Sequence, residues 1–309
     1  MKVIFLDSVH PILEQRLTEA GYECIHDYKT SADTIALVGF TGIVIRSRFR
    51  LSREFLSRFP SLKWIARSGS GLENIDLIAC EELGIKVYNS PEGNSTAVAE
   101  HAIGMLLMLF NKLRIADSEV RQGLWQREAN RGLELEGKTV GIIGYGVMGS
   151  AFAKRLSGFG CRVLAYDKHK SNFGNEIVQE VSLDTLKKES DIVSLHVPLL
   201  GDTKYLVDAH WIASFSKPFY LINTSRGKVA EIKAILDGLK SNKILGACLD
   251  VLEYEETSFE KINLNTPEFN ELKELNNVIF SPHVAGWTVE SYEKLSSVLA
   301  DKILGESQV

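Results

Sequence analysis

The sequence contains little cysteine: Cys24, Cys80, Cys161 and Cys248 are the only four in 309 residues. They lie far apart, and none of them forms a C-x-x-C pair or a cluster with histidine. A structural zinc site needs closely spaced ligands of that kind, so we expect no metal site. The expected state is four reduced thiols that pack mostly as small apolar side chains.

Long hydrophobic runs are also lacking. The longest run, residues 102–110, contains a glycine and is shorter than the roughly 20 apolar residues that cross a bilayer. Residues 1–11 contain Asp7 and lack the long apolar core of a secretion signal. We therefore expect a soluble cytoplasmic protein with no membrane partner.

Positive charge is not in excess. Lys and Arg number 35 against 40 Asp and Glu, which gives a formal net charge of −5. Nucleic acid is an improbable main partner for such a chain, because phosphate binding needs a basic face. Apolar residues make up 45% of the sequence, and the length suffices for about two domains, each with its own core.

Short β-branched runs alternate with helical patterns along the whole chain. This alternation is typical of an α/β fold with parallel sheets. The expected strands cover residues 3–7, 22–26, 42–47, 63–68 and 85–89, and then 139–144, 162–166, 191–195, 219–223, 245–250 and 277–281. The last six match the strand count of a full dinucleotide-binding domain. We expect one amphipathic helix over 288–303, and a loop with a short helix over 252–275.

A glycine pattern, Gly144-Tyr-Gly146-Val-Met-Gly149, follows the first of these six strands and precedes a helical pattern. In this context the pattern predicts a dinucleotide fingerprint, in which the glycines allow a tight turn and close approach to a pyrophosphate. A structural glycine turn without a nucleotide is the alternative. The next strand ends at Asp167, 23 residues after Gly144. Its carboxylate would bind ribose hydroxyls and repel a 2′-phosphate, so NAD is favoured over NADP.

Three polar segments follow later strands: residues 223–227 with Arg226, 250–255 with Glu255, and 281–286 with His283. The carboxyl ends of parallel strands meet at the edge where ligands bind in open α/β sheets. Arginine binds carboxylates in a bidentate manner. Histidine can exchange a proton with an alcohol near neutral pH, and a neighbouring carboxylate stabilises its protonated form. These residue types indicate a hydride-transfer site.

These segments resemble the D-isomer-specific 2-hydroxyacid dehydrogenase family. Its motifs N-T-x-R-G, D-V-F-x-x-E-P and P-H-I-G/A-G correspond to residues 223–227, 250–255 and 282–286. An R-x-G-x-G-x-x-N-I-D loop corresponds to residues 67–76, and N-S-T-A-V-A-E corresponds to 94–100. The resemblance runs nearly end to end.

The resemblance implies a particular domain arrangement. A Rossmann-type doubly wound parallel sheet, residues 96–282, would be inserted into a smaller flavodoxin-like α/β substrate domain. That substrate domain would comprise residues 1–95 and 283–309. The family also implies a homodimer that forms through the nucleotide domains.

The resemblance implies roles for individual residues. His283 would be the acid/base on the substrate oxygen, Glu255 its partner, and Arg226 the ligand of the substrate carboxylate, together with the backbone N–H groups of Ser70 and Gly71. The NAD site would consist of Gly144, Gly146, Val147, Met148, Gly149, Asp167, His196, Val197, Pro198, Thr203, Thr224, Ser225, Asp250 and Gly286.

Three further residues, Glu256, His101 and His196, have side chains that can exchange protons. The family usually has proline after its catalytic glutamate, whereas Glu256 follows Glu255 here, so Glu256 is an alternative partner of His283. His101 lies within an apolar helical run, and we expect it to pack within that helix. We expect His196 to lie at a strand end near the cofactor rather than to act as a catalyst.

Residues 43–48, with Arg46 and Arg48, are similar to the equivalent segment of D-3-phosphoglycerate dehydrogenases. Arginines there could bind a phosphate, which would make the chain a short form of that enzyme of serine biosynthesis, without a C-terminal regulatory domain. A solvated basic strand end is the alternative. Other possible functions are a glyoxylate/hydroxypyruvate or D-lactate type reductase and a non-enzymatic NAD-sensing binding protein.

Overall fold

The computed structural model describes residues 1–36, 38–255 and 262–306, and the described chain divides into two compact units. The first unit comprises the described residues of 1–95 and 287–306, and the second comprises 96–255 and 262–286. The chain leaves the second unit after Gly286, four residues later than the sequence pattern places the boundary. His283 therefore lies in the same unit as Arg226 and Glu255.

The first unit is built on a parallel sheet, in the order β2-β1-β3-β4-β5 among the described residues. This order is that of flavodoxin-like folds. Its elements are β1 (Lys2–Phe5), α1 (Ile12–Glu19), β2 (Glu23–His26), β3 (Phe40–Ile45), α2 (Arg53–Ser57), β4 (Trp64–Arg67), α3 (Leu77–Glu82), β5 (Lys86–Asn89) and α11 (Val289–Glu306).

Both faces of this sheet are covered. Leu13 and Leu17 of α1 pack in one cluster with Leu299 of α11, and Phe55 of α2 and Ala79 of α3 pack in another. Because strands of a parallel sheet are buried on both sides, they are nearly continuous apolar runs rather than alternating ones. This explains why the sequence identifies them well.

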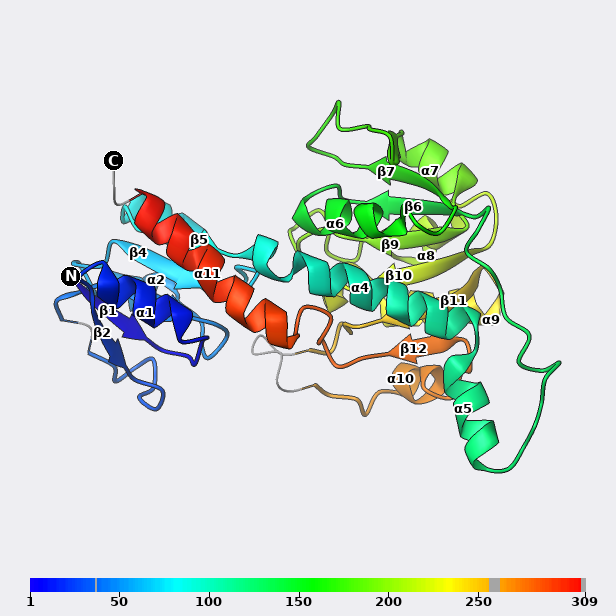
Figure 1. Ribbon diagram of the computed structural model, residues 1–309, viewed down its shortest axis with the longest axis horizontal. Coiled ribbons are helices and arrows are strands. Elements are labelled where there is room, and N and C mark those ends of the chain that lie inside the picture. Colours follow the sequence, from blue (N-terminus) through cyan, green and yellow to red (C-terminus); the bar gives the residue numbers. More distant parts are fainter. Residues whose placement is uncertain (37, 256–261, 307–309) are drawn as a thin grey trace. The chain divides into compact units, whose positions relative to one another are not determined.

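The second unit contains a larger parallel sheet in the order β12-β11-β10-β9-β6-β7-β8 within the described part of the chain (Figure 1). Its elements are α4 (Pro91–Phe110), α5 (Leu113–Arg121), β6 (Thr139–Ile143), α6 (Val147–Leu156), β7 (Arg162–Tyr166), β8 (Val178–Glu180), α7 (Leu183–Glu189), β9 (Ile192–Leu195), α8 (Ala209–Ala213), β10 (Phe219–Asn223), η1 (Gly227–Val229), α9 (Ile232–Lys240), β11 (Ile244–Leu249), α10 (Pro267–Leu272) and β12 (Val278–Phe280). Residues 91–95, the first turn of α4, belong to the first unit.

Two apolar clusters cover the faces of this second sheet. Phe110 of α4 and Phe152 of α6 lie in one, and Trp211 of α8 and Ile235 of α9 lie in the other. The strand order reverses between β6 and β9, which creates a switch point at the carboxyl ends of these strands. The glycine fingerprint, Asp167 and the three polar segments all follow strands of this sheet, so they share one edge.

No helix in the described ranges is long and apolar enough to span a membrane. Within the same ranges, no group of three His, Cys, Asp or Glu side chains could hold a metal ion. The four cysteines carry free thiols, and Cys80 and Cys248 are buried.

Candidate active site

His283 and Glu255 form a close pair in the second unit. His283 follows β12, Glu255 lies in the loop after β11, and Nδ1 of the histidine is 2.6 Å from Oε2 of the glutamate. The two side chains are 23% and 12% exposed. Glu255 Oε1 also accepts the backbone N–H of Leu252 at 2.6 Å, so the carboxylate is oriented by its own loop. Glu256, the alternative partner, lies outside the described residues.

The buried carboxylate of Asp250 fixes the loop that carries His283. Its Oδ1 accepts the Ser281 hydroxyl at 2.6 Å and the Val284 N–H at 2.9 Å, and its Oδ2 accepts the Ala285 N–H at 3.0 Å. The Asp250 backbone carbonyl accepts the His283 N–H at 2.7 Å. His283 has φ 54°, a left-handed conformation that costs a non-glycine residue about 1 kcal/mol. The hydrogen bonds to Asp250 hold His283 in this left-handed conformation.

Arg226 lies in a tight loop after β10. The Asn223 side chain accepts the N–H and hydroxyl of Ser225, and donates to the Arg226 carbonyl at 3.2 Å. Arg226 Nη1 in turn donates to the Ser225 carbonyl at 2.7 Å. A Cβ on Gly227 would lie 1.9 Å from the Leu252 carbonyl oxygen. Only glycine allows this approach, which brings the Arg226 loop against the loop that carries Glu255.

The glycine fingerprint has different constraints at its three glycines. Gly144 has φ 91°, and a Cβ there would lie 2.5 Å from the His196 carbonyl oxygen. A Cβ on Gly149 would lie 2.1 Å from the Gly144 carbonyl oxygen. A Cβ on Gly146, by contrast, would meet no described atom within 4 Å. The outer glycines are therefore required by packing, whereas the open space beside Gly146 fits a pyrophosphate at the start of α6, where Val147 and Met148 lie.

Asp167 follows β7 and closes this turn. Its Oδ2 accepts the Tyr145 N–H at 2.7 Å, and its Oδ1 accepts the N–H groups of His169 and Lys170. Desolvation alone would raise the pKa of Asp167, but these N–H groups and the Lys170 charge lower the pKa below its ordinary value. The carboxylate is thus ionised at neutral pH, as ribose binding with exclusion of a 2′-phosphate requires.

The remaining residues expected at the cofactor lie around β9 and β10. Burial lowers the pKa of His196 to about 4, so its ring is neutral beside the Ser194 hydroxyl, 2.8 Å away. Val197 follows it, and the Pro198 carbonyl accepts the Thr203 hydroxyl at 2.6 Å. Thr224 Oγ1 is buried with no hydrogen-bond partner in the part of the chain that the structure describes. An orphaned hydroxyl at a strand end is consistent with a ligand that supplies its partner.

Ser70 and Gly71, the expected carboxylate ligands of the first unit, lie in the loop after β4. The Ser70 hydroxyl donates to Asn94 Oδ1, and the Ser70 carbonyl accepts Asn89 Nδ2, both at 2.7 Å. The Ser90 hydroxyl accepts the Gly69 N–H at 3.3 Å. The sequence did not identify Asn89 and Ser90 as supports of this loop, and no motif that we recognised pointed to them.

Arg46 and Arg48 have different surroundings within the first unit. The Asp7 carboxylate accepts the backbone N–H of both residues. The Arg46 guanidinium lies over the Trp287 ring, 4.1 Å from its centroid. Arg46 Nη1 also donates to the Ser8 carbonyl at 3.5 Å. The Arg48 guanidinium donates to three backbone carbonyls, those of residues 6, 27 and 30. Arg48 is therefore a structural residue that ties the end of β1 to the turn after β2, and we retain only Arg46 as a candidate ligand of a phosphate.

We predict that Gly146→Ala weakens NADH binding by roughly tenfold or more without loss of stability, because its methyl group enters open space beside an ordinary backbone conformation. Gly149→Ala is the control, since its Cβ would collide with the Gly144 carbonyl and should lower stability directly. NADH fluorescence titration and thermal unfolding measure the two effects. Unchanged NADH affinity in Gly146→Ala would contradict this assignment of the fingerprint.

Comparison with known proteins relates this chain to characterised enzymes. Residues 103–285 match the family model for the D-isomer specific 2-hydroxyacid dehydrogenase, NAD binding domain. The chain is 36% identical to a hydroxypyruvate reductase of Thermotoga maritima over 85% of this chain and 84% of that one. It is 35% identical to a D-3-phosphoglycerate dehydrogenase of Haemophilus influenzae, over 98% of this chain and 74% of that one.

A solved structure shares the whole fold. D-lactate dehydrogenase from Aquifex aeolicus, complexed with NAD and lactic acid, superposes with a TM-score of 0.83 at 30% identity, over 100% of this chain and 96% of that one. The expected fold class and the NAD cofactor are thereby confirmed. The chain belongs to the D-isomer-specific 2-hydroxyacid dehydrogenase family and is an NAD-dependent oxidoreductase.

Proposed function

We propose that the substrate of this dehydrogenase is D-3-phosphoglycerate. The observation that carries the proposal is Arg46 at the end of β3, whose half-buried guanidinium is held over the Trp287 ring at 4.1 Å. A cation–π contact of this kind contributes about 0.5–2 kcal/mol and fixes the orientation of a charge. An arginine so oriented suits a phosphate. The H. influenzae phosphoglycerate dehydrogenase, which matches 98% of this chain, supports the choice.

His283 is the proposed acid/base of the reaction. Its Nδ1 is held by Glu255, so the exchangeable proton is carried on Nε2, which takes it from the substrate hydroxyl in oxidation and returns it in reduction. Glu255 stabilises the protonated ring during the exchange. The nicotinamide, when bound, accepts or supplies the hydride at C2 of the substrate.

Arg226, Ser70 and Gly71 are the proposed ligands of the substrate. We propose that Arg226 binds the carboxylate and C2 oxygens, and that the backbone N–H groups of Ser70 and Gly71 bind the carboxylate. Arg226 suits this task because arginine presents parallel N–H donors that match a carboxylate. The hydrogen bonds of Asn223 and Asn89 to these two loops hold the ligands in place.

The proposed cofactor contacts follow the edge of the second sheet. Gly146, Val147 and Met148 would bind the pyrophosphate, and Asp167 the adenosine ribose. His196, Val197, Pro198 and Thr203 would line the adenosine side, while Thr224, Ser225, Asp250 and Gly286 would surround the nicotinamide. The open space beside Gly146 and the orphaned hydroxyl of Thr224 support these two ends of the site.

Hydroxypyruvate or glyoxylate reduction is the second candidate function. Arg48 is engaged with backbone carbonyls, so Arg46 is the one arginine of this segment that we propose for a phosphate. A single arginine binds a phosphate less strongly than a pair, which favours a substrate without a phosphate. The 36% identical hydroxypyruvate reductase of T. maritima also favours this alternative. A role in serine biosynthesis in the cytoplasm belongs to the phosphoglycerate proposal and depends on its outcome.

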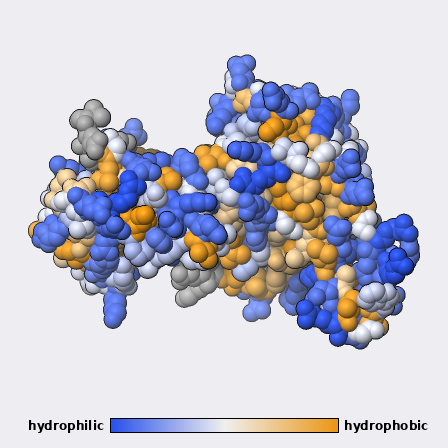
Figure 2. All heavy atoms as spheres, in the orientation of Figure 1, coloured by the Kyte–Doolittle hydropathy of each residue, from blue (hydrophilic) through white to orange (hydrophobic). Residues whose placement is uncertain are grey.

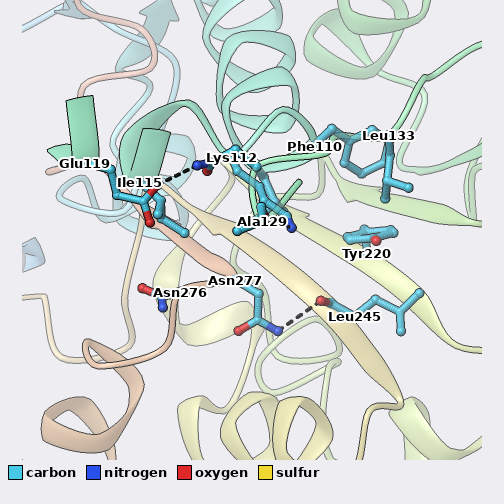
Figure 3. A pocket seen from close by; sticks show the side chains of 12 residues that line it. Phe110, Lys112, Ile115, Glu119, Ala129, Leu133, Tyr220, Leu245, Asn276 and Asn277 are labelled. Carbon is cyan, nitrogen blue, oxygen red and sulfur yellow. Dashed lines mark hydrogen bonds between the residues drawn. The ribbon is translucent and has the colours of Figure 1, made fainter. Parts of the chain in front are cut away.

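We also propose a homodimer that forms through the second unit. The helix α5 has no buried residue, and Leu113, Val120, Leu124 and Trp125 in and after it are exposed, with Trp125 77% exposed. Figure 2 shows hydrophobic residues among hydrophilic ones at the surface in this region. A cavity of about 410 Å³ lies beside α5 (Figure 3). Its lining combines apolar side chains with polar ones: Phe110, Ile115, Leu133 and Tyr220, and Lys112, Glu119, Asn130, Asn276 and Asn277. An exposed apolar surface with an adjacent cavity is typical of an interface.

For the dimer, we predict that light scattering gives about twice the 34.4 kDa mass of one chain, and that Trp125→Ser shifts the equilibrium toward the monomer because it removes exposed apolar area. The surface substitution Ile78→Ser, at a similarly exposed apolar residue of the first unit, is the control and should leave the mass unchanged. A wild-type protein that stays monomeric at high micromolar concentration would contradict the proposal.

For the substrate, we predict that Arg46→Ala lowers kcat/KM for D-3-phosphoglycerate by about tenfold to a hundredfold more than for D-glycerate or D-lactate. Loss of a charge-assisted hydrogen bond costs about 1.5–3 kcal/mol. The exposed neighbour Arg50 provides the control, since Arg50→Ala removes the same charge from the same segment. The assay follows NADH absorbance with all three acids. Equal losses on phosphorylated and unphosphorylated acids would favour the reductase alternative.

For the proton transfer, we predict that the rates of hydroxy-acid oxidation and of keto-acid reduction depend on pH in opposite ways. Oxidation needs an unprotonated base for the substrate hydroxyl and reduction needs a protonated acid, so the rate of oxidation should rise with pH and that of reduction should fall. Glu255→Gln removes the charge that stabilises imidazolium, so both profiles should move to lower pH. Glu253→Gln is the matched control, because its amide oxygen can still accept the Ile232 N–H. If Glu256→Gln moves the profiles and Glu255→Gln does not, then Glu256 is the partner.

A further inference from the structure

His101 lies outside the constellation described so far, yet it touches the residues that hold His283. It belongs to α4, and its Nε2 is 2.8 Å from the Ser281 hydroxyl oxygen and 3.6 Å from Asp250 Oδ1. Its side chain is 28% exposed, whereas that of Asp250 is 1% exposed. All three residues belong to the second unit, although 180 positions separate His101 from Ser281.

The direction of these hydrogen bonds follows from counting protons. Ser281 has one hydroxyl proton, and the Asp250 carboxylate, 2.6 Å away, can only accept. The serine proton is therefore directed at Asp250, since a charged oxygen outcompetes the weaker Met105 sulfur at 3.5 Å. The Ser281 oxygen must then accept from His101, so Nε2 of His101 carries a proton.

We propose that His101 is a positioning residue of the dehydrogenase reaction. It donates to Ser281, which orients the serine proton toward Asp250, and Asp250 in turn holds the backbone of residues 283–285. The inference rests on the proposed acid/base role of His283. It adds a support on α4, a helix that the catalytic motifs do not include.

The left-handed backbone of His283 is the reason that such a support matters. A strained conformation persists only when its surroundings fix it, and the bonds to Asp250 are the ones that do so here. Without His101, the Ser281 oxygen would lose the donor that polarises its hydroxyl, and the hydrogen bond from this hydroxyl to Asp250 would weaken. The carboxylate would then be held less firmly, and with it the loop that carries His283.

The test compares two variants of similar size. His101→Gln retains a side-chain N–H at about the position of Nε2, whereas His101→Leu fills the space without a donor. We expect His101→Leu to lower kcat about tenfold, because small misplacement of an acid/base is costly, and His101→Gln to retain most of kcat. KM for the hydroxy acid should change less than kcat, since Arg226 binds the carboxylate elsewhere.

A second arm separates positioning from packing. If His101 acts through Ser281, Ser281→Ala combined with His101→Leu should be no slower than Ser281→Ala alone. The inference is overturned if the losses in kcat from Ser281→Ala and His101→Leu multiply in the double variant. It is also overturned if His101→Gln and His101→Leu lose kcat equally, or if His101→Leu keeps full activity. Unfolding measurements on every variant ensure that kcat refers to folded enzyme.

His283→Ala distinguishes this inference from the proposal on which it depends. If His283→Ala retains wild-type turnover, the acid/base role fails and the positioning role fails with it. If His283→Ala is strongly impaired and His101→Leu is not, only the positioning role of His101 is wrong.

Discussion

The buried carboxylate of Asp250 is the constraint on which the candidate active site depends. A charge that is 2% exposed is costly unless hydrogen bonds compensate it. Here the compensating donors are Ser281 and the backbone of residues 284–285, which lie after the neighbouring strand β12. The cost of burying Asp250 is thereby linked to the conformation of the loop that carries His283. This linkage explains how a histidine in a left-handed conformation stays in place.

The same edge of the sheet gathers the other functional groups by close backbone approach. Gly227 brings the Arg226 loop against Leu252, and the Leu252 N–H binds Glu255. Parallel strands end side by side, so residues far apart in sequence arrive together without long loops. The proposed proton exchange would thus depend on three short segments that one sheet positions.

The sequence predicted the fold and the pairing of motifs because those signals are local. Buried parallel strands are continuous apolar runs, whereas β8 was missed because it is only three residues long with one buried side chain. The structural role of Arg48 and the contact of His101 with Ser281 could not be predicted. Both are bonds between positions distant in sequence, and neither residue type reveals its partner.

If this chain transfers hydride to a 2-keto acid with His283 as the proton donor, reduction with NADH that carries two deuterium atoms at C4 should place deuterium at C2 of a D-hydroxy acid. Chiral chromatography with mass analysis of the product measures this. Product formation should be slowed about 10²–10⁴-fold in His283→Ala although NADH still binds. Tight NADH binding without label transfer to any 2-keto acid, or undiminished transfer in His283→Ala, would contradict this account.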